Sequence, residues 1–245
     1  MSDVILTVED LTVSFDGFKA VDGLNFYVEK DELRCVIGPN GAGKTTLLDM
    51  ICGKTKPSTG TIKFKKYELS DMIEYQITRI GVGRKFQNPS TYEDLTVLEN
   101  LEISYPKKRN VLGSLFFKRT DEIREKIEAV AKEIFLKDEL HTKAGLLSHG
   151  QKQWLEIGML LMQDPELMLL DEPVAGMSAR ERELTADLLK RISSGRSMVV
   201  IEHDMAFVRM IAHKVTVLHQ GKLLAEGSMD EVQNDERVIE VYLGH

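Results

Sequence analysis

One stretch of the chain has the residue types and spacing of a phosphate-binding loop. Residues 38–46 read GPNGAGKTT and match the pattern G-x-x-x-x-G-K-[ST], in which backbone N–H groups surround the phosphates of a nucleotide. Glycine suits such a loop because it leaves room for phosphate oxygens and accepts positive φ angles. Lys44 supplies a positive charge for the β- and γ-phosphates, and the Thr45 hydroxyl can ligate Mg²⁺. The candidate nucleotide-binding residues are Gly38, Pro39, Asn40, Gly41, Ala42, Gly43, Lys44, Thr45 and Thr46.

Two carboxylates at the end of an apolar run form the second candidate group. Residues 167–170 read as a buried strand, and Asp171 and Glu172 follow directly. Folds of the α/β class bind ligands at the carboxyl ends of their strands. We expect Asp171 to hold Mg²⁺, directly or through water, opposite Thr45, and Glu172 to orient or deprotonate the water that attacks the γ-phosphate. Without a phosphate loop, the same pair would also fit an acidic turn.

The elements that must hold these residues are typical of an α/β core. An apolar run at 33–37 leads into the phosphate loop, and a helix at 44–52 follows, with its positive end directed at the phosphates. Strands and helices alternate in the last third, which favours a buried parallel sheet flanked by helices. The strands expected there are 167–170, 198–201 and 214–218, and the helices are 151–162, 179–192 and 205–211.

The first third and the middle of the chain differ from this core. Short alternating runs separated by Asp-Gly pairs indicate an N-terminal antiparallel β subdomain. The runs are 4–8, 11–15, 24–28, 61–64 and 80–83, and the pairs are 16–17 and 22–23. The middle is charged, with apolar residues at helical spacing over 120–135. We predict one α/β domain of the P-loop NTPase class over 1–245, with a nucleotide-binding core at 1–88 and 151–245 and a helical subdomain inserted at 89–150.

Composition limits the classes of partner. The chain has 245 residues, 42% hydrophobic and 29% charged, with a net charge of −7, which disfavours nucleic acid as the main partner. The N-terminus lacks a basic segment followed by an apolar core, and no run of about 18 apolar residues exists, so neither a signal peptide nor a membrane span is expected. Cys35 and Cys52 fit two buried thiols in a reducing cytoplasm.

The order of the motifs resembles the ATP-binding subunits of ABC transporters. Residues 147–151, LSHGQ, are similar to the signature motif of that family, with His149 in place of a glycine. Gln87 is placed like the glutamine of the family's Q-loop, and His203 like its switch histidine. The resemblance runs from about residue 4 to residue 227.

This resemblance implies roles for residues outside the phosphate loop. Ser148, Gly150 and Gln151 would contact the γ-phosphate of a nucleotide held by a second subunit. Gln87 would contact Mg²⁺ and the attacking water, and His203 would hydrogen-bond the γ-phosphate beside Glu172. Catalysis would thus involve Glu172, His203 and Lys44, and the metal shell would involve Thr45, Gln87 and Asp171. An aromatic side chain would stack on adenine; Phe15 is placed for this, and Phe18 competes with it.

The resemblance also implies an assembly. ATP would join two ATP-binding subunits, identical or paralogous, which would drive transmembrane permease subunits served by an extracytoplasmic solute-binding protein. The chain would then lie in the cytoplasm, peripheral on the inner face of the cell membrane, with ATP and Mg²⁺ as cofactors. Other hypotheses are a soluble ABC ATPase of nucleic-acid maintenance and a P-loop kinase. Phosphate release without an added acceptor separates hydrolysis from kinase activity.

Finer features point to a subfamily. Residues 147–159 and 172–177 are most similar to the ATP-binding subunits of urea importers, relatives of the branched-chain amino-acid importers, which are the alternative. Ser178 stands where the family usually carries an aspartate in the loop that crosses the dimer interface. The basic and apolar segment 107–119 fits either a solvated loop or a patch near lipid headgroups or membrane subunits.

Overall fold

The computed structural model describes residues 3–85, 90–106 and 120–243 of the chain. Its elements form two compact units. The first comprises Met1–Gln87, Glu166–Pro173 and Leu189–His245, and the second comprises Asn88–Pro165 and Val174–Leu188. Across the described ranges, no helix is both long enough and apolar enough to cross a membrane.

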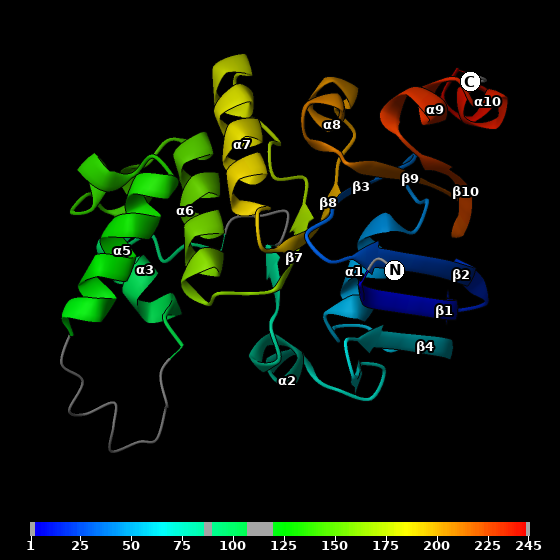
Figure 1. The fold of residues 1–245 in the computed structure, drawn as a ribbon, viewed down its shortest axis with the longest axis horizontal. Helices are drawn as coiled ribbons and strands as arrows, with labels where there is room; N and C mark the ends of the chain where they lie inside the picture. Colours follow the sequence, from blue (N-terminus) through cyan, green and yellow to red (C-terminus); the bar gives the residue numbers. More distant parts are fainter. Residues whose placement is uncertain (1–2, 86–89, 107–119, 244–245) are drawn as a thin grey trace. The chain divides into compact units, whose positions relative to one another are not determined.

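A six-stranded sheet is the centre of the first unit (Figure 1). Its order is β10-β9-β3-β8-β7-β6, and the pairs β9/β3, β3/β8, β8/β7 and β7/β6 are parallel. The strands are β3 (Leu33–Ile37), β6 (Val82–Lys85), β7 (Leu167–Asp171), β8 (Ser197–Ile201), β9 (Lys214–His219) and β10 (Lys222–Gly227). Every residue of β3, β7 and β8 is buried, as expected for parallel strands covered on both faces. The predicted parallel sheet is confirmed.

The parallel arrangement determines where the candidate residues emerge. Strands β3, β7 and β8 end at the same edge of the sheet, because Val36 pairs with Ile201 and Ile201 pairs with Asp171. The phosphate loop follows β3, Glu172 follows β7 and His203 follows β8. The helices of the first unit are α1 (Lys44–Ile51), α2 (Glu74–Arg79), α8 (Met205–Ile211), α9 (Met229–Gln233) and α10 (Glu236–Leu243), and α7 (Ala179–Ile192) contributes its last residues.

A four-stranded antiparallel sheet, in the order β2-β1-β4-β5, forms the predicted N-terminal β part. The run at 80–83 does not belong to it, because that segment forms β6, which pairs parallel with β7. Its strands are β1 (Val4–Phe15), β2 (Phe18–Glu29), β4 (Thr59–Phe64) and β5 (Tyr67–Glu68). The separate strands predicted at 4–8 and 11–15 are wrong, because β1 continues through an irregularity at Asp10, whose φ is 47°. The pair at 22–23 likewise does not end β2, which accommodates Gly23 at a φ of 61°.

The carboxyl-terminal part of the chain holds one strand more than predicted. Strand β10 pairs antiparallel with β9 through a tight turn at Gln220 and Gly221, whose φ angles are 50° and 76°. Positive φ at both central residues is the hairpin geometry that matches the twist of its strands. The prediction ended the sheet at residue 218 because the 222–227 segment, KLLAEG, lacks a clear alternation of apolar residues.

The second unit is helical among its described residues. Helices α3 (Val97–Ser104), α5 (Asp121–Glu133) and α6 (His149–Met162) pack against one another, and short 3₁₀ turns occur at Lys137–Glu139 and Ala144–Leu146. Leu101, Ile127 and Ile157 supply buried contacts from the three helices. The expectation of a charged, strand-poor middle region agrees with these elements. Helix α6 begins at His149, two residues before the predicted start at Gln151.

Candidate active site

The phosphate loop holds its own lysine. Lys44 begins α1, and its Nζ donates to the carbonyl oxygens of Gly38 at 2.7 Å and Pro39 at 3.0 Å. Burial lowers the pKa of the Lys44 ammonium, while Glu172 and Asp171 act in the opposite direction. The positive charge is therefore confined to the loop that the sequence assigns to phosphates. Asn40, Gly41 and Thr45 lie exposed around it.

Two glycines of the loop have no room for a side chain. A Cβ on Gly38, whose φ is 149°, would lie 2.2 Å from the carbonyl oxygen of Leu218 in β9. A Cβ on Gly43, at a φ of 96°, would lie 2.5 Å from the carbonyl oxygen of Ala20 in β2. The loop is thus packed directly on the backbone of both sheets, which holds its shape before any ligand binds.

Asp171 lies at the end of β7 in a buried polar cluster. Its carboxylate accepts a hydrogen bond from the Thr45 hydroxyl and lies 3.5 Å from the Arg84 guanidinium of β6. Arg84 also lies 2.5 Å from Asp49, one turn along α1 from Thr45. Burial raises the pKa of the Asp171 carboxyl above its usual range, and the Arg84 charge opposes that shift. The structure therefore brings together Thr45 and Asp171, the two described residues of the predicted metal set.

Glu172 and His203 also meet. The Oε1 atom of Glu172 lies 3.7 Å from Nδ1 of His203, from the ends of β7 and β8. Glu172 has a φ of 46°, and its backbone N–H donates to the carbonyl oxygen of Ile201 at 3.0 Å. Positive φ is uncommon for a non-glycine residue and clusters at functional sites. Here it turns the chain at the strand end where the Glu172 carboxylate faces His203.

Phe15 and Phe18 pair across the turn that joins β1 and β2. Their exposed fractions are 49% and 65%, so the structure leaves both rings available for stacking on a base. Gln87 and the segment 107–119 lie outside the described residues.

The signature segment, residues 147–151, caps helix α6. The Oγ of Ser148 accepts from the backbone N–H of Gln151 at 3.2 Å, and Gln151 Oε1 accepts from the N–H of Ser148 at 2.9 Å. This reciprocal pair is a capping box, and it explains why α6 starts earlier than predicted. Gly150 follows inside the first turn. These three predicted residues thus lie together at one helix N-terminus of the second unit, where N–H groups favour an anion.

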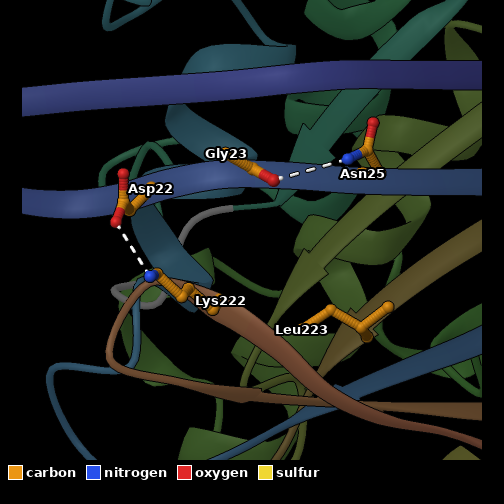
Figure 2. A pocket seen from close by; sticks show the side chains of 5 residues that line it. All are labelled: Asp22, Gly23, Asn25, Lys222 and Leu223. Carbon is orange, nitrogen blue, oxygen red and sulfur yellow. Dashed lines mark hydrogen bonds and ion pairs between the residues drawn. The ribbon is translucent and has the colours of Figure 1, made fainter.

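A separate pocket of about 430 Å³ lies between β2 and β10 in the first unit (Figure 2). Asp22 lies 3.1 Å from Lys222 and 2.7 Å from Lys19, and Lys19 is the main cause that lowers the pKa of Asp22. The pocket charges are thus paired within the chain, and the pocket includes none of the predicted site residues. Its lining consists of Asp22, Gly23, Asn25, Lys222 and Leu223.

Sequence reasoning missed Arg84 and Asp49. The available signal was a pair of cations, Arg84 and Lys85, inside a short strand, since such residues are buried only when they are paired. The partners of Arg84 could not be read from the sequence, because Asp171 is 87 residues away and Asp49 is 35 residues away.

The comparisons with known proteins agree with this geometry. Residues 21–175 match the family model described as ABC transporter, and residues 222–245 match one described as branched-chain amino acid ATP-binding cassette transporter. The high-affinity branched-chain amino acid transport ATP-binding protein BraF of Pseudomonas aeruginosa is 36% identical over all of this chain and 99% of its own length.

The chain belongs to the ABC transporter ATPase family.

Solved structures support the same assignment for this ABC ATPase. The ADP conformation of an ATP-binding cassette has a TM-score of 0.87 at 32% identity, with 99% of each chain covered. A bacterial ABC transporter cassette solved as a dimer has a TM-score of 0.80 at 25% identity, covering 91% of this chain and 98% of the other. The predicted fold class is confirmed, and the ABC ATPase is an enzyme that couples ATP hydrolysis to transport.

Proposed function

We propose that this ABC ATPase energises the import of branched-chain amino acids. The match of residues 222–245 to the branched-chain cassette model carries the proposal, and the full-length similarity to BraF supports it. Urea, the solute favoured by residues 147–159 and 172–177, becomes the second candidate. That reading rests on two short segments, whereas the branched-chain reading rests on the whole chain.

The geometry of the site supports the chemistry proposed for it. Lys44 binds the β- and γ-phosphates, and the loop N–H groups surround them. Glu172 orients or deprotonates the attacking water, and His203, 3.7 Å from Glu172, donates a hydrogen bond to the γ-phosphate. Phe15 or Phe18 stacks on the adenine. Water rather than a metabolite is the acceptor, because a carboxylate follows the metal-binding strand directly.

The polar cluster around Asp171 fits a magnesium ion. Hard cations prefer carboxylate and hydroxyl oxygens, and the Asp171 carboxylate and the Thr45 hydroxyl are already in contact. We propose that these two residues, with Gln87, hold the Mg²⁺ of Mg-ATP. Bound there, the ion neutralises charge that develops on the phosphates. Arg84 balances the buried charge of Asp171 and keeps its carboxylate in place.

The proposed assembly uses both units of the chain. Ser148, Gly150 and Gln151 contact the nucleotide of a second ATP-binding subunit, identical or paralogous. Residues 89–150, which fall within the second unit, form the helical subdomain inserted in the core. Permease subunits hold the ATPase at the cytoplasmic face of the membrane, and an extracytoplasmic solute-binding protein delivers the solute.

The test is transport by the whole complex. The ATPase is purified with its membrane subunits and reconstituted in vesicles with the solute-binding protein, and uptake of leucine, isoleucine, valine and urea is measured with Mg-ATP. Branched-chain amino-acid uptake that is lost with Glu172→Gln supports the proposal. Urea uptake without leucine uptake would replace the solute, and uptake unaffected by Glu172→Gln would remove Glu172 from the mechanism.

A further inference from the structure

The ring of His149 packs against the segment that follows the catalytic carboxylate. Its Nε2 lies 3.0 Å from the carbonyl oxygen of Ala175. A Cβ on Gly176, whose φ is 72°, would lie 3.0 Å from Cδ2 and 3.1 Å from Nε2 of the same ring. Since a carbonyl oxygen only accepts, Nε2 carries the proton and donates it to this bond. His149 therefore holds what we call the 174–178 loop, at two successive residues.

A second link joins the same two segments. One oxygen of the Glu181 carboxylate accepts from the backbone N–H of Ser178 at 2.8 Å and from its hydroxyl at 2.7 Å. The other oxygen lies so close to Gly150 that a Cβ there would be 2.3 Å away. The 174–178 loop is thus hydrogen-bonded to the signature segment through His149, and Glu181, which holds Ser178, packs against the same segment at Gly150.

We propose that His149 is a positioning residue for ATP hydrolysis, which fixes Glu172 by tying the 174–178 loop to the signature segment. The inference rests on the proposed roles of Glu172 and of the signature segment. Ala175 lies three residues after Glu172, with Pro173 between them, so a hold on Ala175 limits the positions that the Glu172 backbone can adopt.

The residue types in this region suit such a tie. Ser178 carries no charge, and its backbone N–H and hydroxyl both donate to the Glu181 carboxylate of the same subunit. Gln153, fully buried on the next turn of α6, has its side-chain amide 3.3 Å from Nε2 of His149. With Nε2 protonated for Ala175, this amide must present its oxygen to the ring, and that oxygen has no other hydrogen-bond partner among the described residues. Glu181 is the charged group that faces His149, and its pKa is lowered chiefly by Ser178, with His149 acting in the same direction.

Three variants of one residue separate positioning from packing. In His149→Gln the amide nitrogen falls close to the place of Nε2 and can donate to Ala175. In His149→Asn the shorter side chain places its amide near Nδ1 instead, so the bond is lost although polarity is kept. His149→Ala removes both. We expect kcat for Mg-ATP hydrolysis to fall about tenfold in the Asn and Ala variants, with KM within about twofold, and to stay within about twofold of wild type in the Gln variant.

Equal rates in the Asn and Gln variants, or a wild-type rate in the Ala variant, overturn the proposal. Should the Ala or Asn variant fail to fold, an NMR measurement on the wild-type protein still tests the contact between His149 and Ala175. Nitrogen-15 NMR at pH 8 reports which ring nitrogen is protonated, and the His149 signal is the one that disappears in His149→Gln. We expect the Nε2–H form, and an Nδ1–H ring contradicts the contact.

A double-mutant cycle with Gly176→Ala measures the same contact independently. The strain of positive φ is common to both backgrounds and cancels, so only the clash with the ring remains. We expect Gly176→Ala to lower kcat at least threefold more in the wild-type background than in the His149→Ala background. Additive effects of the two substitutions would contradict the contact between His149 and the 174–178 loop. A Glu172→Gln enzyme that hydrolyses ATP normally would refute the proposed function instead, whereas the NMR result judges the His149 contact alone.

Discussion

At the scale of single residues, Asp171 is a buried carboxylate that lowers the stability of the fold and suits the binding of a cation. Asp171 is only 3% exposed, and ionised carboxylates are costly to bury. Thr45 and Arg84 compensate in part, but burial still dominates and raises the pKa of Asp171. A residue chosen for folding alone would be neutral here. The charge is explained if a cation arrives with the nucleotide.

The pH dependence of stability tests this interpretation of Asp171. Its folded pKa lies above the ordinary value of 3.8, so between those two values the folded protein binds more protons than the unfolded chain. The free energy of unfolding contributed by Asp171 therefore falls as pH rises from about 4 through the folded pKa, and stays low above it. Asp171→Asn removes this titration.

We measure urea unfolding of wild type and Asp171→Asn from pH 4 to pH 7 in the absence of nucleotide. The difference in free energy of unfolding should shift in favour of the Asn variant as pH rises, because the variant escapes the cost of a buried charge. The same variant should lose the dependence of ATP binding on Mg²⁺. Two parallel stability curves would show that burial does not control the Asp171 pKa.

At the scale of elements, the loop between β3 and α1 depends on contact with β9. Gly38 faces the Leu218 carbonyl oxygen directly, whereas Gly41, at a φ of 79°, has open space where a Cβ would go. Both need a backbone conformation that alanine adopts with strain, but only Gly38 is also packed against another strand. The two positions form a matched pair.

Alanine at each position gives a prediction about this packing. Gly41→Ala should lower the free energy of unfolding by about 1 kcal/mol, the cost of positive φ. Gly38→Ala should cost about 3 kcal/mol or more, because the backbone of the loop or of β9 must also move. Urea denaturation of the nucleotide-free proteins measures both, and equal losses would contradict the assigned contact with Leu218.

The same element shows what sequence can and cannot supply. The phosphate loop, Asp171 and Glu172 were predictable because each is a local pattern joined to an apolar strand. Strand β10 was not, since an edge strand needs little apolar alternation, and β1 was divided because a bulge interrupts its pattern. The ion pair between Arg84 and Asp171 and the packing contact between Gly150 and Glu181 join residues far apart in the chain. Only the fold brings these residues together.

At the scale of the whole molecule, the candidate residues are divided between the two units. The phosphate loop, Asp171, Glu172 and His203 belong to the first, and Ser148, Gly150 and Gln151 belong to the second. A signature segment that ends in a helix N-terminus offers N–H groups to an anion. The proposed role of that segment requires a second subunit, so association should depend on ATP.

Light scattering of Glu172→Gln with and without Mg-ATP tests this dependence. The Gln side chain slows turnover by at least about 100-fold while the phosphate loop still binds ATP, so an ATP-bound dimer should accumulate. The control is the double variant Lys44→Ala/Glu172→Gln, which lacks the loop cation and should remain monomeric. A Glu172→Gln chain that binds ATP and stays monomeric would contradict self-pairing. The signature segment would then serve the nucleotide of a paralogous subunit, and the same assay with that subunit added should restore association.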